Sequence, residues 1–138
     1  MAFVLDASTT LSWHFEDEAP NAVRATLRLA FDEGVVVPQH WLLEVSSALL
    51  RGERRNRSPI EDTDAFLSRL GEIPIESAAA DPDRIAGVII PLARSHHLSV
   101  YDAAYLELAG RRELPLATLD RSLARAARAV GVALIEGL

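Results

Sequence analysis

The sequence predicts an α/β fold with a mostly parallel sheet that is covered by helices on both faces. Short, almost uninterrupted apolar segments alternate along the chain with longer segments of helical spacing, which is typical of strand–helix–strand units. Strands that are apolar throughout are buried on both faces, as the strands of parallel sheets are. The 138 residues contain no repeat and no low-complexity tract, so we expect a single domain over residues 1–138.

The chain begins with a predicted strand, followed by two helices. Residues 3–5 are apolar and end at Asp6, which indicates a short buried strand. A helix is expected over residues 8–15, with Asp6 in position to cap it. Residues 21–34 have apolar side chains at helical spacing, and Gly34 is expected to end that helix.

A second strand and two more helices follow. The strand Val35–Pro38 is apolar and is closed by a proline. Residues 40–55 place apolar side chains on one face of a helix. Ser58 and Pro59 are typical of a helix start, with an N-cap and a proline at the first helical position, and this helix is expected to run to Leu70.

The second half of the chain continues the alternation of strands and helices. Its expected helices have apolar side chains three and four residues apart, and its expected strands are short apolar segments. Strands are expected at residues 73–76, 114–119 and 133–135, and helices at residues 83–96, 101–109 and 121–130.

Two residue types that the chain lacks exclude several kinds of catalytic site. The absence of cysteine excludes disulfides, zinc–thiolate sites, iron–sulfur clusters and thiol catalysis. All 14 basic residues are arginine, so there is no lysine for a phosphate-binding P-loop, a Schiff base or a pyridoxal enzyme. The missing lysine also excludes receiver domains and haloacid-dehalogenase-like phosphatases, and the latter need a second aspartate where this chain has Ser8.

Nothing in the sequence indicates a membrane protein. No apolar run approaches the ~18 residues of a membrane-spanning helix. The first residues lack the basic region and the long apolar core of a signal peptide. We therefore expect a cytoplasmic protein that does not bind a membrane.

Asp6 and Asp120 each follow a predicted strand. In parallel α/β sheets the ligand crevice lies outside the carboxyl ends of the strands, so both carboxylates are candidates for a functional site. Each also has a local explanation, because Asp6 could cap the helix over residues 8–15 and Asp120 could cap the last helix.

Glu44 and Asp102 lie on predicted helices. Glu44 is in phase with the apolar side chains of the 40–55 helix, so it is expected to face inward, where an ionised carboxylate needs a cationic partner. That partner is either an arginine or a metal ion. Asp102 is in the first turn of its helix, where the helix dipole also favours a negative charge.

Together the four acidic side chains predict a metal site. Like charges that are brought to one crevice stay ionised only around a bound cation. Because the set offers carboxylate oxygens, with no cysteine and no clear histidine spacing motif, it suits Mg²⁺ or Mn²⁺ rather than zinc.

The segments around these acids resemble those of the PIN-domain family, and most of all the VapC-type toxins of bacterial toxin–antitoxin pairs. The order and spacing of all four acids agree with the family pattern, and the match extends over essentially the whole chain. The matching segments are Val4-Leu5-Asp6-Ala7-Ser8, Pro38-Gln39-His40-Trp41-Leu42-Leu43-Glu44-Val45, Tyr101-Asp102-Ala103-Ala104-Tyr105 and Leu116-Ala117-Thr118-Leu119-Asp120.

The resemblance implies a three-layer α/β/α fold with a central, mostly parallel five-stranded sheet. It also implies a toxin with Mg²⁺- or Mn²⁺-dependent endoribonuclease activity, a cognate antitoxin protein and a homodimer. On this hypothesis a metal-activated water hydrolyses an RNA phosphodiester bond, and no nucleophilic side chain is needed. The implied metal-binding and catalytic residues are Asp6, Glu44, Asp102 and Asp120, and the implied supporting hydroxyls are those of Thr118 and Ser8.

Arg121, Arg125 and Arg128 share one face of the last predicted helix. Because this helix begins beside Asp120, they are candidates for binding RNA phosphates, which guanidinium groups bind in a bidentate manner. The simpler interpretation is a solvated helix face. The net charge of −6 does not exclude RNA as a substrate, because without the four proposed ligands it becomes −6 + 4 = −2.

A function of another class stays open, in which the PIN fold is a binding or regulatory module with little catalysis. Metal binding distinguishes the two functions. A nuclease is stabilised by Mg²⁺ or Mn²⁺ because the ion binds only the folded state. Carboxylates that only cap helices or form ion pairs show no such effect.

Overall fold

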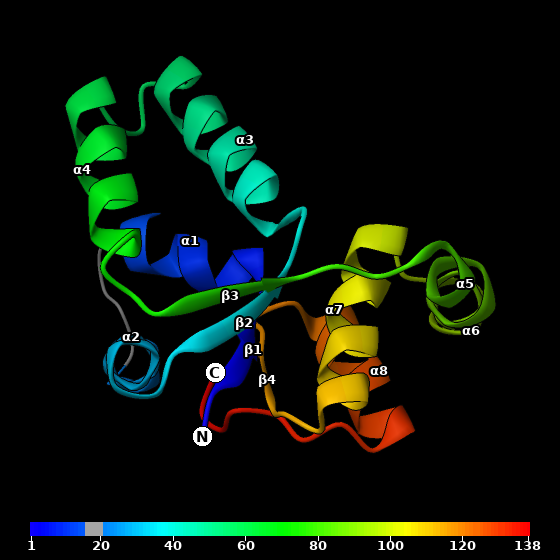
Figure 1. The fold of residues 1–138 in the computed structure, drawn as a ribbon. Coiled ribbons are helices and arrows are strands. Elements are labelled where there is room, and N and C mark those ends of the chain that lie inside the picture. Colours follow the sequence, from blue (N-terminus) through cyan, green and yellow to red (C-terminus); the bar gives the residue numbers. More distant parts are fainter. Residues whose placement is uncertain (16–20) are drawn as a thin grey trace.

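Strands and helices alternate along residues 1–15 and 21–138, which the computed structural model describes (Figure 1). The predicted α/β class is confirmed. No helix in this described part of the chain is long and apolar enough to cross a membrane. The elements are β1 (Phe3–Leu5), α1 (Ala7–Phe15), α2 (Asn21–Glu33), β2 (Val35–Pro38), α3 (Trp41–Arg54), α4 (Ile60–Leu70), β3 (Ile75–Ala78), α5 (Pro82–Arg84), the π-helix η1 (Ile85–Ile89), α6 (Ile90–His96), α7 (Val100–Arg112), β4 (Leu116–Ala117) and α8 (Arg121–Val130).

The four strands form one parallel sheet in the order β3-β2-β1-β4. The fifth strand predicted at residues 133–135 is instead a single parallel bridge between Leu116 and Leu134. Pairing stops there because β4 has only two residues, and from Thr118 onward the chain turns toward α8. The parallel α/β architecture is as predicted, with one strand reduced to a bridge.

Helices cover the sheet on both sides. In Figure 1, α1 and α2 lie on one side, and α7 and α8 lie on the other. Helix α7 packs against β1 and β2, and its Tyr105, Leu106 and Leu108 share a buried core with β1. Because parallel strands all end at one edge of the sheet, the residues that follow β1 and β4 meet at that edge beside α7.

Prolines explain two differences between the predicted and observed boundaries. Strand β3 begins at Ile75 instead of at residue 73, because Pro74 has no amide proton to donate and only its carbonyl pairs, accepting from the Val35 amide at 2.9 Å. The N-cap of α4 is Pro59, without a side-chain hydrogen bond. The prediction of Ser58 as the cap is therefore wrong, although the helix itself is present.

The helix predicted over residues 83–96 is continuous but not regular. It consists of α5, the π-helical turn η1 and α6. Pro91 lacks the amide proton that would donate to the carbonyl of Gly87 in an α-helix, so the ladder is interrupted where the chain widens into the π-turn.

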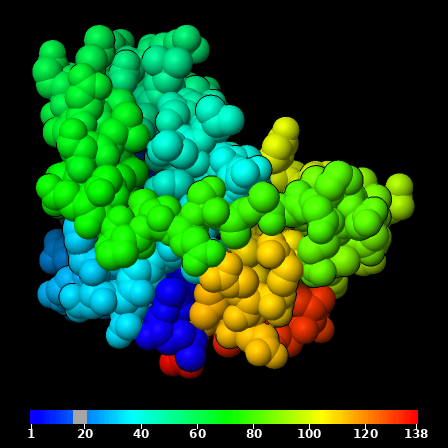
Figure 2. Space-filling view, in the orientation of Figure 1, coloured from blue at the N-terminus to red at the C-terminus, as the bar shows by residue number. Residues whose placement is uncertain are grey.

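The remaining helices form two projections from the sheet. Helices α3 and α4 pair and extend away from it (Figure 1). The segment from β3 to α5 lies on the surface between this pair and α6 (Figure 2). On α3 the side chains of Leu42, Leu43 and Leu50 are exposed, so this helix has apolar surface that nothing in the described chain covers.

Candidate active site

Asp6 is a buried carboxylate at the end of β1, where 3 % of the residue is exposed. It caps α1, because its Oδ1 accepts the Thr9 amide at 2.9 Å. The Ser8 hydroxyl donates to the two carboxylate oxygens at 2.9 and 2.8 Å, and the Thr118 hydroxyl donates to Oδ2. Burial raises the pKa of Asp6 to about 6, against the opposite effect of these hydrogen bonds.

Asp120 is the N-cap of α8, and its Oδ1 accepts the Leu123 amide at 2.8 Å. Its own amide donates to the Thr118 hydroxyl at 3.0 Å. Thr118 therefore joins Asp120 to Asp6 through one side chain. Both residues cap helices, as the local explanation predicted. They are also linked through Thr118, so capping does not exclude a shared site.

Glu44 lies on α3 at the rim of this edge, and 33 % of its side chain is exposed. Its Oε1 accepts a hydrogen bond from the Tyr105 hydroxyl at 2.8 Å and lies 3.0 Å from Nε2 of His40. Of the two expected partners, an arginine is not found among the described residues, where an imidazole and a phenol contact Glu44 instead, and the metal ion stays a prediction. The prediction that Glu44 faces inward is confirmed only in part. Its carboxylate contacts the buried Tyr105, but the side chain stays partly exposed to solvent.

Asp102 occupies the first turn of α7, where its amide donates to the hydroxyl of the N-cap Ser99 at 3.0 Å. Burial raises the pKa of its carboxyl, and repulsion from Asp120 and Glu44 raises it further. Asp120 is the N-cap of α8, and Glu44 lies in the first turn of α3. Their effect on one carboxyl places Asp102, Asp120 and Glu44 in a common electrostatic environment, and Thr118 links the fourth acid, Asp6, to Asp120.

The chemistry of this acidic cluster (Asp6, Glu44, Asp102 and Asp120) fits a hard divalent cation. In residues 1–15 and 21–138, none of the three aspartates forms an ion pair, and the partner of the glutamate is a histidine. Carboxylate oxygens without arginine neutralisation suit Mg²⁺ or Mn²⁺. The same described residues hold no group of three or more His, Asp or Glu side chains already arranged to bind a metal ion. The cluster therefore has donor atoms of the right kind, but in the described residues they do not form a metal-binding group as they stand.

Comparison with known proteins agrees with this arrangement, because residues 3–129 match the model of the PIN domain. The chain belongs to the PIN domain family. Its resemblance to VapC-type members is also confirmed. Ribonuclease VapC3 of Mycobacterium tuberculosis is 35 % identical over 114 residues, which cover 80 % of this chain and 78 % of that protein.

Solved structures share the fold of this PIN domain. PAE2754 from Pyrobaculum aerophilum superposes with a TM-score of 0.73 at 20 % identity, covering 99 % of this chain and 90 % of that one. A toxin–antitoxin complex from Klebsiella pneumoniae has a TM-score of 0.63 at 14 % identity, with coverage of 99 % and 100 %. FitAcB from Neisseria gonorrhoeae has a TM-score of 0.61 at 19 % identity, with coverage of 96 % and 95 %.

Two residues of this PIN domain site were not anticipated from the sequence, namely His40 and Tyr105. A signal for each was present, because His40 precedes Glu44 by four residues on one helical face and Tyr105 follows Asp102 by three. The contact between Tyr105 and Glu44 joins two helices, however, and helical phase alone does not give such a pairing.

The arginines of α8 lie beside the acidic cluster of this PIN domain. Arg121, Arg125 and Arg128 are all exposed, and together with Asp120 they line a shallow depression. In the described part of the chain none of the three arginines forms an ion pair. Three guanidinium groups are thus available to an anion that approaches the cluster.

Proposed function

We propose that this PIN domain protein is a metal-dependent endoribonuclease and the toxin of a type II toxin–antitoxin pair, acting in the cytoplasm. The observation that supports the proposal is the acidic cluster, in which four carboxylates from four segments lie near one sheet edge and none pairs with an arginine in residues 1–15 and 21–138. The similarity to Ribonuclease VapC3 supports RNA as the substrate class.

The proposed cofactor is Mg²⁺ or Mn²⁺. Asp6, Glu44 and Asp102 would hold the principal ion, and Asp120 would complete the cluster or help to hold a second. Such an ion supplies a Lewis acid that activates water and neutralises the charge that develops on the phosphate.

The chain's own hydrogen bonds would orient these ligands. Ser8 and Thr118 hold the Asp6 carboxylate in place. Tyr105 holds Glu44 by the same oxygen that faces His40. Polar groups that fix a ligand's orientation in this way strengthen a metal site and reduce the reorganisation needed when the ion binds.

Arg121, Arg125 and Arg128 would bind the phosphates of the RNA beside the cleaved bond. Replacement of Arg121 and Arg125 by glutamine should weaken RNA binding and make it less sensitive to salt, because each lost phosphate contact removes released counterions. Binding measured at several salt concentrations tests this role, and an unchanged salt dependence would contradict it.

We expect two protein partners, a cognate antitoxin and a second copy of this chain. The solved toxin–antitoxin complex from Klebsiella pneumoniae contains a chain of the same fold. The exposed leucines of α3 offer apolar surface for such contacts.

A catalytically weak binding module is the second candidate, and one observation favours it. Asp6 and Asp120 already cap helices, and no ready metal cage exists among the described residues. In that case the carboxylates would serve the fold, and Mn²⁺ would not stabilise the protein.

Cleavage of total cellular RNA by the antitoxin-free protein tests the proposal. The reaction is run with Mg²⁺, with Mn²⁺ and with chelator, and the new RNA ends are mapped by sequencing. Discrete cuts that need metal and disappear in the Asp6→Asn variant are expected, whereas Asp64→Asn, which changes an exposed acid of α4, should cut normally. Folded protein that neither cuts RNA nor binds Mn²⁺ would favour the binding module.

A further inference from the structure

A pocket of about 250 Å³ lies beside the acidic cluster. It is bounded by the last residues of β2 and β3, Pro38 and Ala78, and by Ala104 and Leu108 of α7. Ile89 of η1 closes another side. Its walls are thus mostly apolar. A single water needs only about 10–15 Å³ of cavity volume, so the pocket has room for a planar base.

The pocket shares residues with the proposed active site. His40 lines it, and the Nε2 atom of the same residue lies 3.0 Å from Oε1 of Glu44. Tyr101 also lines it and directly precedes Asp102 in the chain. An occupant of the pocket would therefore lie next to the carboxylates.

The entrance of the pocket carries an available aromatic ring. Tyr101 is 60 % exposed, and its ring centroid lies 5.2 Å from that of His40. An exposed tyrosine at the mouth of an apolar pocket offers a face on which a base can stack. Gln39, another lining residue, brings an amide that can both donate and accept a hydrogen bond.

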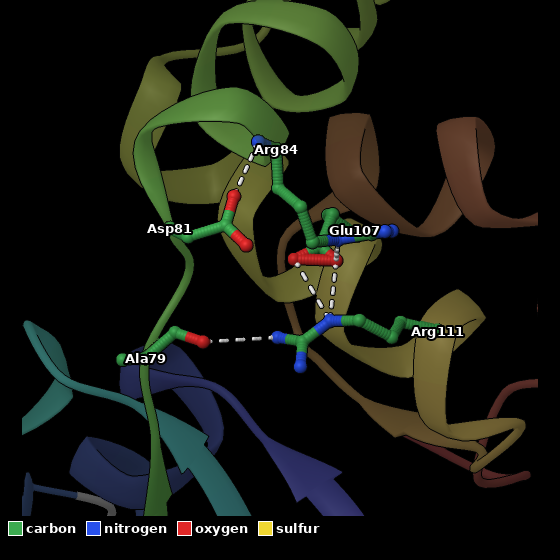
Figure 3. A network of polar contacts seen from close by, with 5 residues as sticks. All are labelled: Ala79, Asp81, Arg84, Glu107 and Arg111. Carbon is green, nitrogen blue, oxygen red and sulfur yellow. Dashed lines mark hydrogen bonds and ion pairs between the residues drawn. The ribbon is translucent and has the colours of Figure 1, made fainter.

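On the opposite side of the pocket, the lining residues Glu107 and Arg111 belong to a polar network that also contains Ala79, Asp81 and Arg84 (Figure 3). The Glu107 side chain, only 1 % exposed, lies between Arg84 and Arg111 at 3.2 and 2.9 Å. Arg111 also donates to the Ala79 carbonyl at 3.3 Å. Asp81 accepts the Arg84 amide at 2.8 Å, so two carboxylates balance the two guanidinium groups, and this side of the pocket offers hydrogen-bonding groups without a net charge.

We propose that this pocket binds one nucleobase of the RNA substrate, at a nucleotide next to the cleaved phosphate. This inference rests on the proposed function. A base has apolar faces and a polar edge, which match the apolar walls, the Tyr101 ring and the polar groups of Gln39 and Arg111. The highly charged phosphates stay outside, because apolar walls do not solvate them.

The proposal makes Tyr101 and the pocket determinants of RNA affinity and of the cleavage position. A protein side chain is the alternative occupant, but it would not need the exposed ring, the polar groups of Gln39 and Arg111 and the shared His40 together. The nucleobase accounts for all three features.

Binding of single-stranded RNA in the presence of chelator tests the role of Tyr101 without requiring catalysis. The probe is a random-sequence RNA pool, followed by an oligonucleotide that spans a mapped cleavage site. Tyr101→Ala should weaken binding about 5- to 150-fold, the fold-change that corresponds to the ~1–3 kcal/mol of one base–aromatic stack. Tyr101→Phe keeps the ring and should bind as the unchanged protein does. Phe31→Ala, which removes an exposed ring from α2, is the matched control.

Two further comparisons locate the effect in the pocket. Ala104→Leu fills the pocket without changing charge and should shift the sequence preference at one nucleotide. An oligonucleotide that lacks the base at that nucleotide should bind the unchanged protein as weakly as Tyr101→Ala binds the intact one, and the two losses should not add.

The outcomes separate this inference from the proposed function. Unchanged protein that neither binds nor cuts RNA would overturn both. Normal RNA cleavage with unaltered affinity and sequence preference in folded Tyr101→Ala and Ala104→Leu would overturn the inference alone. Loss of antitoxin binding in these variants, with RNA binding intact, would assign the pocket to a protein partner and would also overturn it.

Discussion

The Tyr105 hydroxyl donates a 2.8 Å hydrogen bond to Oε1 of Glu44 across 61 positions of the chain. Tyr105 is almost fully buried in α7, and Glu44 is half-buried on α3. His40 approaches the same oxygen. A rigid core residue thereby fixes the orientation of a carboxylate that would otherwise be free at the rim of the acidic cluster.

Tyr105→Phe should weaken Mn²⁺ binding about tenfold or more, the range found when a group that orients a metal ligand is lost. Unfolding free energy should fall by only ~1 kcal/mol, because a single hydrogen bond is lost and the ring stays in the core. Calorimetric titration with Mn²⁺ and urea unfolding measure the two effects. Tyr101→Phe is the control, and equal Mn²⁺ affinity in both variants would show that Tyr105 has a structural role only.

Asp102→Asn should stabilise the protein in chelator and abolish RNA cleavage. The raised pKa of Asp102 shows that burial and the charges of Asp120 and Glu44 disfavour its ionised form. Removing one charge relieves this repulsion, with an expected gain of a few tenths to ~1 kcal/mol for a partly exposed group. Added Mn²⁺ should stabilise the unchanged protein more than the variant.

Thermal unfolding with chelator and with Mn²⁺ gives both comparisons. Asp64→Asn, on the surface of α4, should show neither effect. A destabilised Asp102→Asn variant that gains as much from Mn²⁺ as the unchanged protein would contradict the assignment of Asp102 as a ligand.

The fold was predictable where apolar runs are buried on both faces. Strands β1 and β2 begin and end at the predicted residues, because every side chain in these runs is buried and no alternative register is available. Boundaries at prolines were less predictable. At Pro74 and Pro91 the missing amide proton decides where a ladder starts or is interrupted, and apolar periodicity carries no information about that.

The candidate site was predictable to the extent that topology alone determines it. Asp6 and Asp120 follow parallel strands, and such positions meet at one sheet edge in any fold of this class. The partner of Glu44 was not predictable, because it depends on how α3 and α7 are placed relative to each other. Burial indicates only that a carboxylate needs a partner, and it does not indicate that a hydroxyl from another helix supplies a hydrogen bond.

His14 should make the protein less stable at mildly acidic pH. Its ring lies 4.7 Å from those of Phe15 and Phe66, and its buried Nε2 atom forms no hydrogen bond to residues 1–15 or 21–138. Burial lowers the pKa of His14; the nearby Arg57 lowers it further and Asp62 opposes this. Because the folded-state pKa lies below the unfolded value of about 6.5, the unfolded chain binds more protons in this range. Stability is therefore present above pH ~6.5 and is lost as the pH falls below it.

Urea unfolding between pH ~5 and ~8 measures the contribution of His14 to this pH dependence. A His14→Phe variant should lose less stability at the acidic end than the unchanged protein, since a phenyl ring has no proton to bind. His97→Gln removes an exposed histidine instead and should leave the pH dependence in place. Identical pH profiles for His14→Phe and the unchanged protein would contradict the prediction.

The ion pairs of Glu107 should contribute to stability in a strongly non-additive way. The Glu107 side chain is 1 % exposed, whereas those of Arg84 and Arg111 are 38 % and 27 % exposed. Replacing one arginine by methionine leaves the carboxylate with the other partner, so a loss of only ~1 kcal/mol is expected. Replacing both leaves a buried charge without a cation and should cost ~3–5 kcal/mol, more than the sum of the single changes.

Replacing Glu107 by methionine as well should recover most of this loss, because an apolar side chain of similar volume needs no partner in the interior. Urea unfolding of the two single variants, the double variant and the triple variant measures the complete set of couplings. Additive losses in the double variant, or a triple variant no more stable than the double one, would mean that solvent rather than the two arginines compensates the Glu107 charge.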